Sequence, residues 1–176
     1  NVACEAVLVE GDSFTVSLES TFLIPGGATS ISFEYADLAF DTTSTGLIKD
    51  AFEAALLDGD GNSLVPTYLA GRDAYFNITD GLSVQAGSKT SVTDTTVTLD
   101  ISDVPELSQA RLVLRLVNND DDTLTAVRIT RVGLPVELQG VQEEVDANAV
   151  SNQQPSLQTQ SQRVPRDRRI ANALST

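Results

Sequence analysis

Hydrophobic and polar residues alternate along most of the chain up to Val132. A period of two is typical of β-strands, because successive side chains point to opposite faces of a strand. The longest run extends from Phe14 to Ile24 and ends at Pro25, which lacks a backbone donor, and at the glycines that follow it. Further short runs are separated by turn residues, and none has a helical period. The pattern predicts an all-β protein, an antiparallel β-sandwich.

The alternation changes parity once within a single apolar run. The residues concerned are Ile31, Phe33 and Tyr35, followed by Ala36, Leu38 and Phe40. A β-bulge produces such a change, and so does a strand that crosses from one sheet to the other. An irregularity is therefore expected between Tyr35 and Ala36.

Residues 50–69 predict a strand, a turn and a second strand that includes Leu64 and Tyr68. The turn, DGDGN at Asp58–Asn62, is similar to the start of an EF-hand calcium loop. An EF-hand also needs flanking helices and a bidentate Glu at its twelfth position, which is Leu69 here. The Asp-Gly and Gly-Asn pairs favour a hairpin turn instead.

The segment Gln109–Val132 contains two alternating runs separated by an acidic stretch. Leucines occupy one face of the first run, and Val127 and Ile129 continue that face in the second. Arginines occupy the opposite face of both runs. The pattern predicts a β-hairpin with an acidic tip between Asn118 and Thr123.

The parities of these runs also predict which side chains form the core. The residues expected to be buried are Phe14, Val16, Leu18, Phe33, Phe52, Leu112, Leu114, Val127 and Ile129. A further strand should place Val97, Leu99 and Ile101 inward and Thr96, Thr98 and Asp100 outward.

The sequence divides into a β-sandwich domain, residues 1–134, and a polar C-terminal tail, residues 135–176. The tail is rich in Gln, Asn, Ser and Arg and shows no strand alternation. A segment with few large apolar residues cannot offset the ~1–2 kcal/mol per residue that backbone ordering costs by folding on itself. The tail is therefore expected to be ordered only through contacts with other surfaces.

Charge and composition narrow the possible partners. The chain has a formal net charge of −14, and 20 of its 25 acidic residues precede Gly133. This charge argues against nucleic acid and anionic membranes as partners, and no run approaches the ~20 apolar residues of a membrane-spanning helix. His, Met and Trp are absent, and Cys4 is the only cysteine. Cys4 is a buried small residue, a thiol for an intermolecular bond or a lipid-modified residue.

Four strings resemble a known family. They are SISFEYADLAFDTTSTGLIKDAFEAALLDGDGNSLV, AYFNITDG, TVTLDIS and ARLVLRLVNNDDDTLTAVRI. They look like a jelly-roll module that is repeated in large secreted surface proteins of planctomycetes and cyanobacteria. The resemblance covers roughly Phe14 to Val132, and RLVNND is its most specific feature. It implies a jelly-roll-like sandwich and an extracellular or cell-surface, non-catalytic part in adhesion or matrix structure.

The acidic tip of the predicted hairpin suggests a cation site. Asp120, Asp121 and Asp122 repel one another unless a positive charge lies among them, and a hard cation with oxygen ligands supplies one. Together with the resemblance, this predicts calcium at the rim of the sandwich, bound by some of these residues, Asp41 and backbone carbonyls. A solvated acidic loop is the alternative.

Three classes of function remain open. A glycosidase could use two carboxylates from among Asp37, Asp41, Asp50 and Glu53, although a sandwich this acidic produces such pairs without catalysis. A calcium-dependent carbohydrate-binding module suits the fold, but with no Trp and few Tyr it offers little aromatic stacking. A non-catalytic structural or adhesive module that packs with copies of itself fits the scarcity of catalytic residue types best.

The tail supports this structural function, because it could bridge neighbouring subunits. Gly140–Val150 or Val164–Leu174 could add a strand to the sheet edge of another copy. The arginines Arg163, Arg166, Arg168 and Arg169 would meet an acidic domain there, in a salt-sensitive contact. The expected partners are therefore copies of the chain or other surface modules, with polysaccharide as a further possibility.

Overall fold

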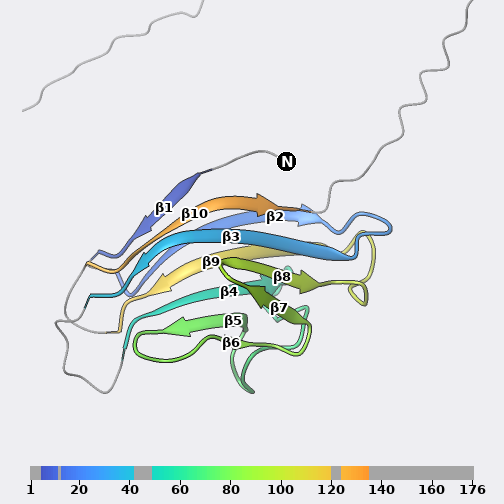
Figure 1. The fold of residues 1–176 in the computed structure, drawn as a ribbon. Coiled ribbons are helices and arrows are strands. Elements are labelled where there is room, and N and C mark those ends of the chain that lie inside the picture. The colour runs from blue at the N-terminus through green and yellow to red at the C-terminus, as the bar shows by residue number, and fades with distance from the viewer. Residues whose placement is uncertain (1–4, 12, 42–48, 120–123, 135–176) are drawn as a thin grey trace, which may run out of the picture. The chain divides into compact units, whose positions relative to one another are not determined.

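The computed structural model describes residues 5–11, 13–41, 49–119 and 124–134. These residues form the two layers of an antiparallel β-sandwich (Figure 1). The strands are β1 (Ala6–Val9), β2 (Thr15–Leu23), β3 (Ser30–Ala39), β4 (Ala51–Leu57), β5 (Ala74–Thr79), β6 (Gln85–Ala86), β7 (Thr90–Thr93), β8 (Thr96–Asp100), β9 (Gln109–Val117) and β10 (Ala126–Gly133). No helix long and apolar enough to cross a membrane occurs in this described part of the chain.

The strand order is that of a jelly roll. One sheet has the order β1-β10-β3-β8-β7 and the other β2-β9-β4-β5-β6. The chain changes sheet after β1, β2, β3, β6, β8 and β9, so most connections cross an end of the sandwich. The predicted all-β fold is confirmed, and the connections after β1, β3 and β9 meet at the same end.

The core lies between the inner faces of the two sheets. Phe33 and Tyr35 from one sheet contact Phe52 and Phe76 from the other, with ring centroids 5.6–6.1 Å apart across the interface. All four side chains are buried. Edge-to-face and tilted contacts of this kind add to the stability that the buried apolar area provides.

The predicted hairpin between Gln109 and Val132 is wrong. β9 pairs with β2 and β4, whereas β10 pairs with β1 and β3 in the other sheet. The inward positions were predicted correctly, because a strand shows the same alternation whichever sheet holds it. The chain therefore changes sheet between β9 and β10.

Most of the predicted core is confirmed, with one error. Phe33, Phe52, Leu112, Leu114, Val127 and Ile129 are buried, as are Val97, Leu99 and Ile101. Val16 and Leu18 face the core but are half-buried, because β2 is the edge strand of its sheet. Phe14 is 67% exposed. It precedes the first residue of β2, Thr15, so the strand geometry that turns Val16 and Leu18 inward does not extend to it.

The predicted parity change is a β-bulge. Ala126 pairs with Ala39 and Arg128 with Ala36, so β3 holds one extra residue over this interval. Asp37, within the bulge, has a φ of 53°. Bulges accept such backbone conformations, and short polar Asp tolerates them better than most residues do.

The turn at Asp58–Asn62 is confirmed, but no strand follows it. Asp58 N donates to Asn62 O at 2.8 Å, and the Asp58 carboxylate accepts from Asp60 N and Asn62 N. A single bridge between Leu57 and Ser63 replaces the predicted strand, and the next strand, β5, begins at Ala74. Pro66, which lacks an N–H, lies inside the predicted strand and explains the difference.

Candidate metal centre

Three acidic residues converge where the connections after β1, β3 and β9 meet. Glu10 follows β1, Asp41 follows β3, and Asp50 precedes β4. One carboxylate oxygen from each of the three lies within 4.8 Å of the others. Residues from distant parts of the sequence thus form one acidic cluster, which we call the loop-end cluster.

Thr125, from the connection between β9 and β10, holds the loop-end cluster together. Its side chain and backbone are fully buried. Glu10 N donates to Thr125 O at 2.9 Å, and Thr125 N donates to Glu10 Oε2 at 3.2 Å. The Thr125 hydroxyl donates to Asp50 Oδ2 at 2.9 Å and accepts from Asp41 N at 3.4 Å. One threonine therefore contacts all three acidic residues.

The asparagines of the RLVNND string support the same arrangement. Asn119 N donates to Asp50 Oδ1 at 2.9 Å, and its side-chain amide donates to Lys49 O at 2.9 Å. Asn118 donates to Gly11 O at 3.2 Å. These bonds tie the end of β9 to the connections that hold Glu10 and Asp50.

The cluster leaves buried carboxylate oxygens without a partner. Glu10 and Asp50 are 5% and 2% exposed. Glu10 Oε1 and Asp41 Oδ1 are buried and accept no hydrogen bond from the described residues. Burial, and then the nearby charge of Asp50, raise the pKa of Glu10 to about 7, while hydrogen bonds from Thr125 act in the opposite direction. The site is therefore short of positive charge.

Oxygen donors in this number and kind suit a hard cation. Calcium binds six to eight oxygens from carboxylates, hydroxyls, carbonyls and water, and it tolerates irregular geometry. The two unpaired oxygens and the Asp50 carboxylate could bind one face of such an ion. Magnesium fits less well, because it demands a near-ideal octahedron.

Only one of the four residues predicted for the metal site is among the described residues. Asp41 belongs to the loop-end cluster, whereas Asp120, Asp121 and Asp122 lie outside the described residues. The nearest described residues on either side both donate to the cluster, Asn119 N to Asp50 Oδ1 at 2.9 Å and Leu124 N to Asp41 Oδ2 at 3.0 Å. Sequence reasoning did not place Glu10 and Asp50 in this cluster. The predicted assembly residues Arg163, Arg166, Arg168 and Arg169 also lie outside the described residues.

Of the four carboxylates considered for a glycosidase, two lie together and two lie elsewhere. Asp41 and Asp50 belong to the loop-end cluster, but Glu53 accepts hydrogen bonds from Arg115 on the outer face of β4. Asp37 accepts from Arg128 Nε at 2.8 Å on the other sheet. Glu53 and Asp37 are thus each engaged by an arginine.

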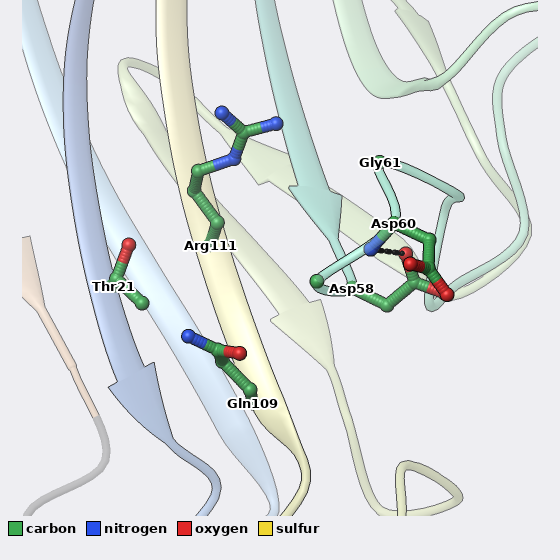
Figure 2. A pocket seen from close by; sticks show the side chains of 7 residues that line it. Thr21, Asp58, Asp60, Gly61, Gln109 and Arg111 are labelled. Carbon is green, nitrogen blue, oxygen red and sulfur yellow. Dashed lines mark hydrogen bonds between the residues drawn. The ribbon is translucent and has the colours of Figure 1, made fainter.

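A second feature is an open pocket beside the turn at Asp58–Asn62. It encloses about 310 Å³, and its lining residues are Thr21, Asp58, Gly59, Asp60, Gly61, Gln109 and Arg111. Figure 2 shows the turn residues Asp58 and Asp60 on one side and the side chains from β2 and β9 on the other. The lining is polar and contains no aromatic ring.

Comparison with known proteins found no match. No family model, no curated protein and no solved structure is significantly similar to this chain.

Proposed function

We propose that this chain is a non-catalytic structural or adhesive module of the extracellular space or cell surface, stabilised by calcium and packing with copies of itself. The loop-end cluster carries the proposal. An ion bound by Glu10, Asp41 and Asp50 would link the connection after β1 to the connection after β3, which the described residues otherwise join through hydrogen bonds alone. Such a link would stabilise the end of the sandwich where the chain repeatedly changes sheet.

The extracellular setting follows from the chemistry of the ion and from the family resemblance. Extracellular calcium modules bind with dissociation constants of roughly 10⁻⁴–10⁻³ M, matching calcium concentrations outside cells. A site with three protein carboxylates and an uncompensated buried charge suits that environment. The strings RLVNND and SISFEYADLAF, which resemble secreted surface modules, favour the same location.

The absence of His and the single Cys favour a non-catalytic role. General acid–base chemistry would have to rest on carboxylates, and nucleophilic chemistry would lack its usual His partner. The acidic domain and the basic residues of the tail favour contacts between copies. Arg163, Arg166, Arg168 and Arg169 are the residues that we propose for these contacts.

Calcium should raise the melting temperature of the full chain. At a hundredfold excess of free calcium over its dissociation constant, the stabilisation is about 2.7 kcal/mol. For a domain of this size that corresponds to roughly 10 °C. Differential scanning calorimetry in chelator, calcium and magnesium measures the effect, and magnesium should give a smaller shift.

Asp41→Asn should abolish the calcium response, because it removes one ligand charge while keeping an oxygen acceptor for Leu124 N. Asp60→Asn is the matched control, since Asp60 is exposed and lies beyond the opposite end of β4 from Asp50. A melting curve of the unaltered chain that is the same in chelator and in calcium would contradict the proposed ion.

The open pocket favours carbohydrate binding as a second candidate function. The pocket offers several polar groups that can form hydrogen bonds with sugar hydroxyls. They are the hydroxyl of Thr21, the amide of Gln109, the carboxylate of Asp60 and the guanidinium of Arg111. Isothermal titration with soluble polysaccharides tests it. Arg111→Ala should weaken binding, and equal binding by this variant would place the sugar elsewhere.

A further inference from the structure

The edge strands of the sandwich differ in length. β1 and β7 have 4 residues each and β6 has 2, whereas β2 has 9. An edge strand presents unpaired backbone groups, and proteins protect such edges by making them short, charged, proline-containing or bulged. Shortness protects three of these four edges but not β2.

β2 also lacks the other protective features. It contains no Pro, Lys or Arg. Its register with β9 runs from Thr15 opposite Val117 to Leu23 opposite Gln109 without a shift. Its one charged residue, Glu19, is paired with Arg111 of β9 at 3.3 Å. β2 is therefore a long, regular and nearly uncharged edge.

The hydrogen bonds at both ends of β2 show which backbone groups are open. Asn118 N donates to Phe14 O at 2.9 Å, and Ile24 N donates to Ser108 O at 3.0 Å. In an antiparallel pair such bonds recur at every second residue, so the even-numbered residues bond to β9. The odd-numbered residues point their N–H and C=O groups away from the sheet, and these groups have no partner among the described residues. They are Thr15, Ser17, Glu19, Thr21 and Leu23.

The inner face of β2 is incompletely covered as well. Val16, Leu18 and Phe22 pack against the core but remain half-buried. Leu23, on the outer face, is 57% exposed. A strand added beside β2 would cover this apolar area, and its backbone would form hydrogen bonds with the open N–H and C=O groups of β2.

We propose that β2 pairs antiparallel with β2 of a second copy around a two-fold axis, joining the two five-stranded sheets into one. This inference rests on the self-assembly proposed above and names its interface. The edge is suited to its own copy, because an antiparallel two-fold pairing brings identical strands together with the same face inward. It needs no residue of the tail.

The side chains favour a register centred on Leu18. In that register Leu18 lies opposite Leu18 of the partner subunit, and Ser17 lies opposite the partner's Glu19. The Ser17 hydroxyl, which donates to Glu19 of its own chain at 3.0 Å, could then donate to the partner's Glu19. A register centred on Glu19 would oppose two like charges, which is unfavourable in a cross-strand pair.

Ser17→Pro in the full chain tests the interface. The Ser17 N–H points outward, so proline removes a bond to the partner but none to β9, and prolines are tolerated at such edge positions. Sedimentation equilibrium should give the unaltered chain twice its mass of 18.7 kDa and Ser17→Pro the single mass. Ser17→Thr keeps the N–H and hydroxyl and should remain dimeric. Circular dichroism confirms that both variants are folded.

The outcomes separate the two proposals. An unaltered chain that is monomeric at every concentration overturns self-assembly and the β2 interface together. An assembly that survives Ser17→Pro overturns only the interface. If exchanging the four tail arginines for glutamine abolishes assembly while Ser17→Pro leaves it intact, tail contacts are responsible and β2 pairing is wrong.

Disulfide trapping tests the register without relying on a proline. In a Cys4→Ser background, Leu18→Cys should cross-link two copies on oxidation, because residue 18 lies on the axis opposite itself. Ser20→Cys should not, since residue 20 lies opposite Val16 of the partner subunit. Cross-linking of Ser20→Cys, or of neither variant, would overturn this pairing.

Discussion

Two regions of this sandwich bury carboxylates, and they compensate the charge differently. On the outer face of β4, Glu53 is 4% exposed and accepts from Arg115 Nε at 3.0 Å and Nη2 at 2.6 Å. The same guanidinium donates to Asp73 at 2.9 and 2.6 Å. These bonds raise the pKa of Arg115 and lower that of Asp73. This Arg115 network supplies its own cation.

Among the described residues, the loop-end cluster has only neutral donors. Thr125, Asn119 and Leu124 provide hydrogen bonds, and no salt bridge between described residues includes Glu10, Asp41 or Asp50. Buried charge without compensation is costly, so a fold retains it where something outside the chain supplies the opposite charge. The contrast between the regions is therefore an argument for a bound cation at the loop end.

Breaking the Arg115 network should have the largest effect. Arg115→Met leaves Glu53 buried without its cation, and removal of one partner of a buried pair costs about 3–5 kcal/mol. Urea unfolding followed by circular dichroism measures the loss, which should be the same in chelator and in calcium. Arg111→Met is the control, because its pair with Glu19 is exposed and worth about 0–1 kcal/mol. Equal losses in both variants would contradict the contrast between the two regions.

Glu10→Gln should change the sign of its effect with calcium. In chelator at pH 8 it removes one of the like charges of the loop-end cluster and should stabilise the domain by about 1 kcal/mol. In calcium it removes a ligand, so the variant should be less stable than the unaltered chain. Unfolding midpoints in the two buffers measure both effects. Destabilisation of equal size in both buffers would mean that Glu10 has only a structural role.

The two regions should depend on pH in opposite directions when calcium is absent. The pKa of Glu10 rises from 4.5 to about 7 on folding, so its contribution to stability is fully present below pH 4.5 and is lost as pH rises to about 7. The pKa of Asp73 is lowered from 3.8, so its contribution is present above that pH and is lost on further acidification.

Unfolding midpoints across the pH range in chelator measure this pH dependence. Glu10→Gln should remove the decline toward neutral pH, and Asp73→Asn should reduce the decline in acid. A decline toward neutral pH that persists in Glu10→Gln would assign it to another group.

Much of the fold was predictable because alternation reports local geometry. It identified Leu114, Val127 and Phe52 as inward residues and predicted a bulge in β3, which lies between Ala36 and Ala39, just beyond the expected position between Tyr35 and Ala36. It could not assign β9 and β10 to sheets, since both sheets present an identical inner face to the core. The predicted hairpin failed for that reason.

The candidate site was only partly predictable. Asp41 was named for a metal site, but Glu10 and Asp50 were not, because each is an isolated acid beside a strand and carries no local pattern. The cluster exists only because the connections after β1 and β3 meet at one end, where Thr125 from the connection after β9 binds both. The run Asp120–Asp122 did indicate the connection between β9 and β10. Asn119 and Leu124 of that connection donate hydrogen bonds to the cluster.

The sequence alone determined most of the strands, their inward faces, the presence of a bulge and the acidic character of the domain, since these depend on residues adjacent in the chain. The tertiary structure alone decided which strands pair, which carboxylates meet and which edge stays open. Pairing brings together residues far apart in sequence, and the free energy that selects it comes from the packed core as a whole. Both the loop-end cluster and the open edge of β2 are consequences of that pairing.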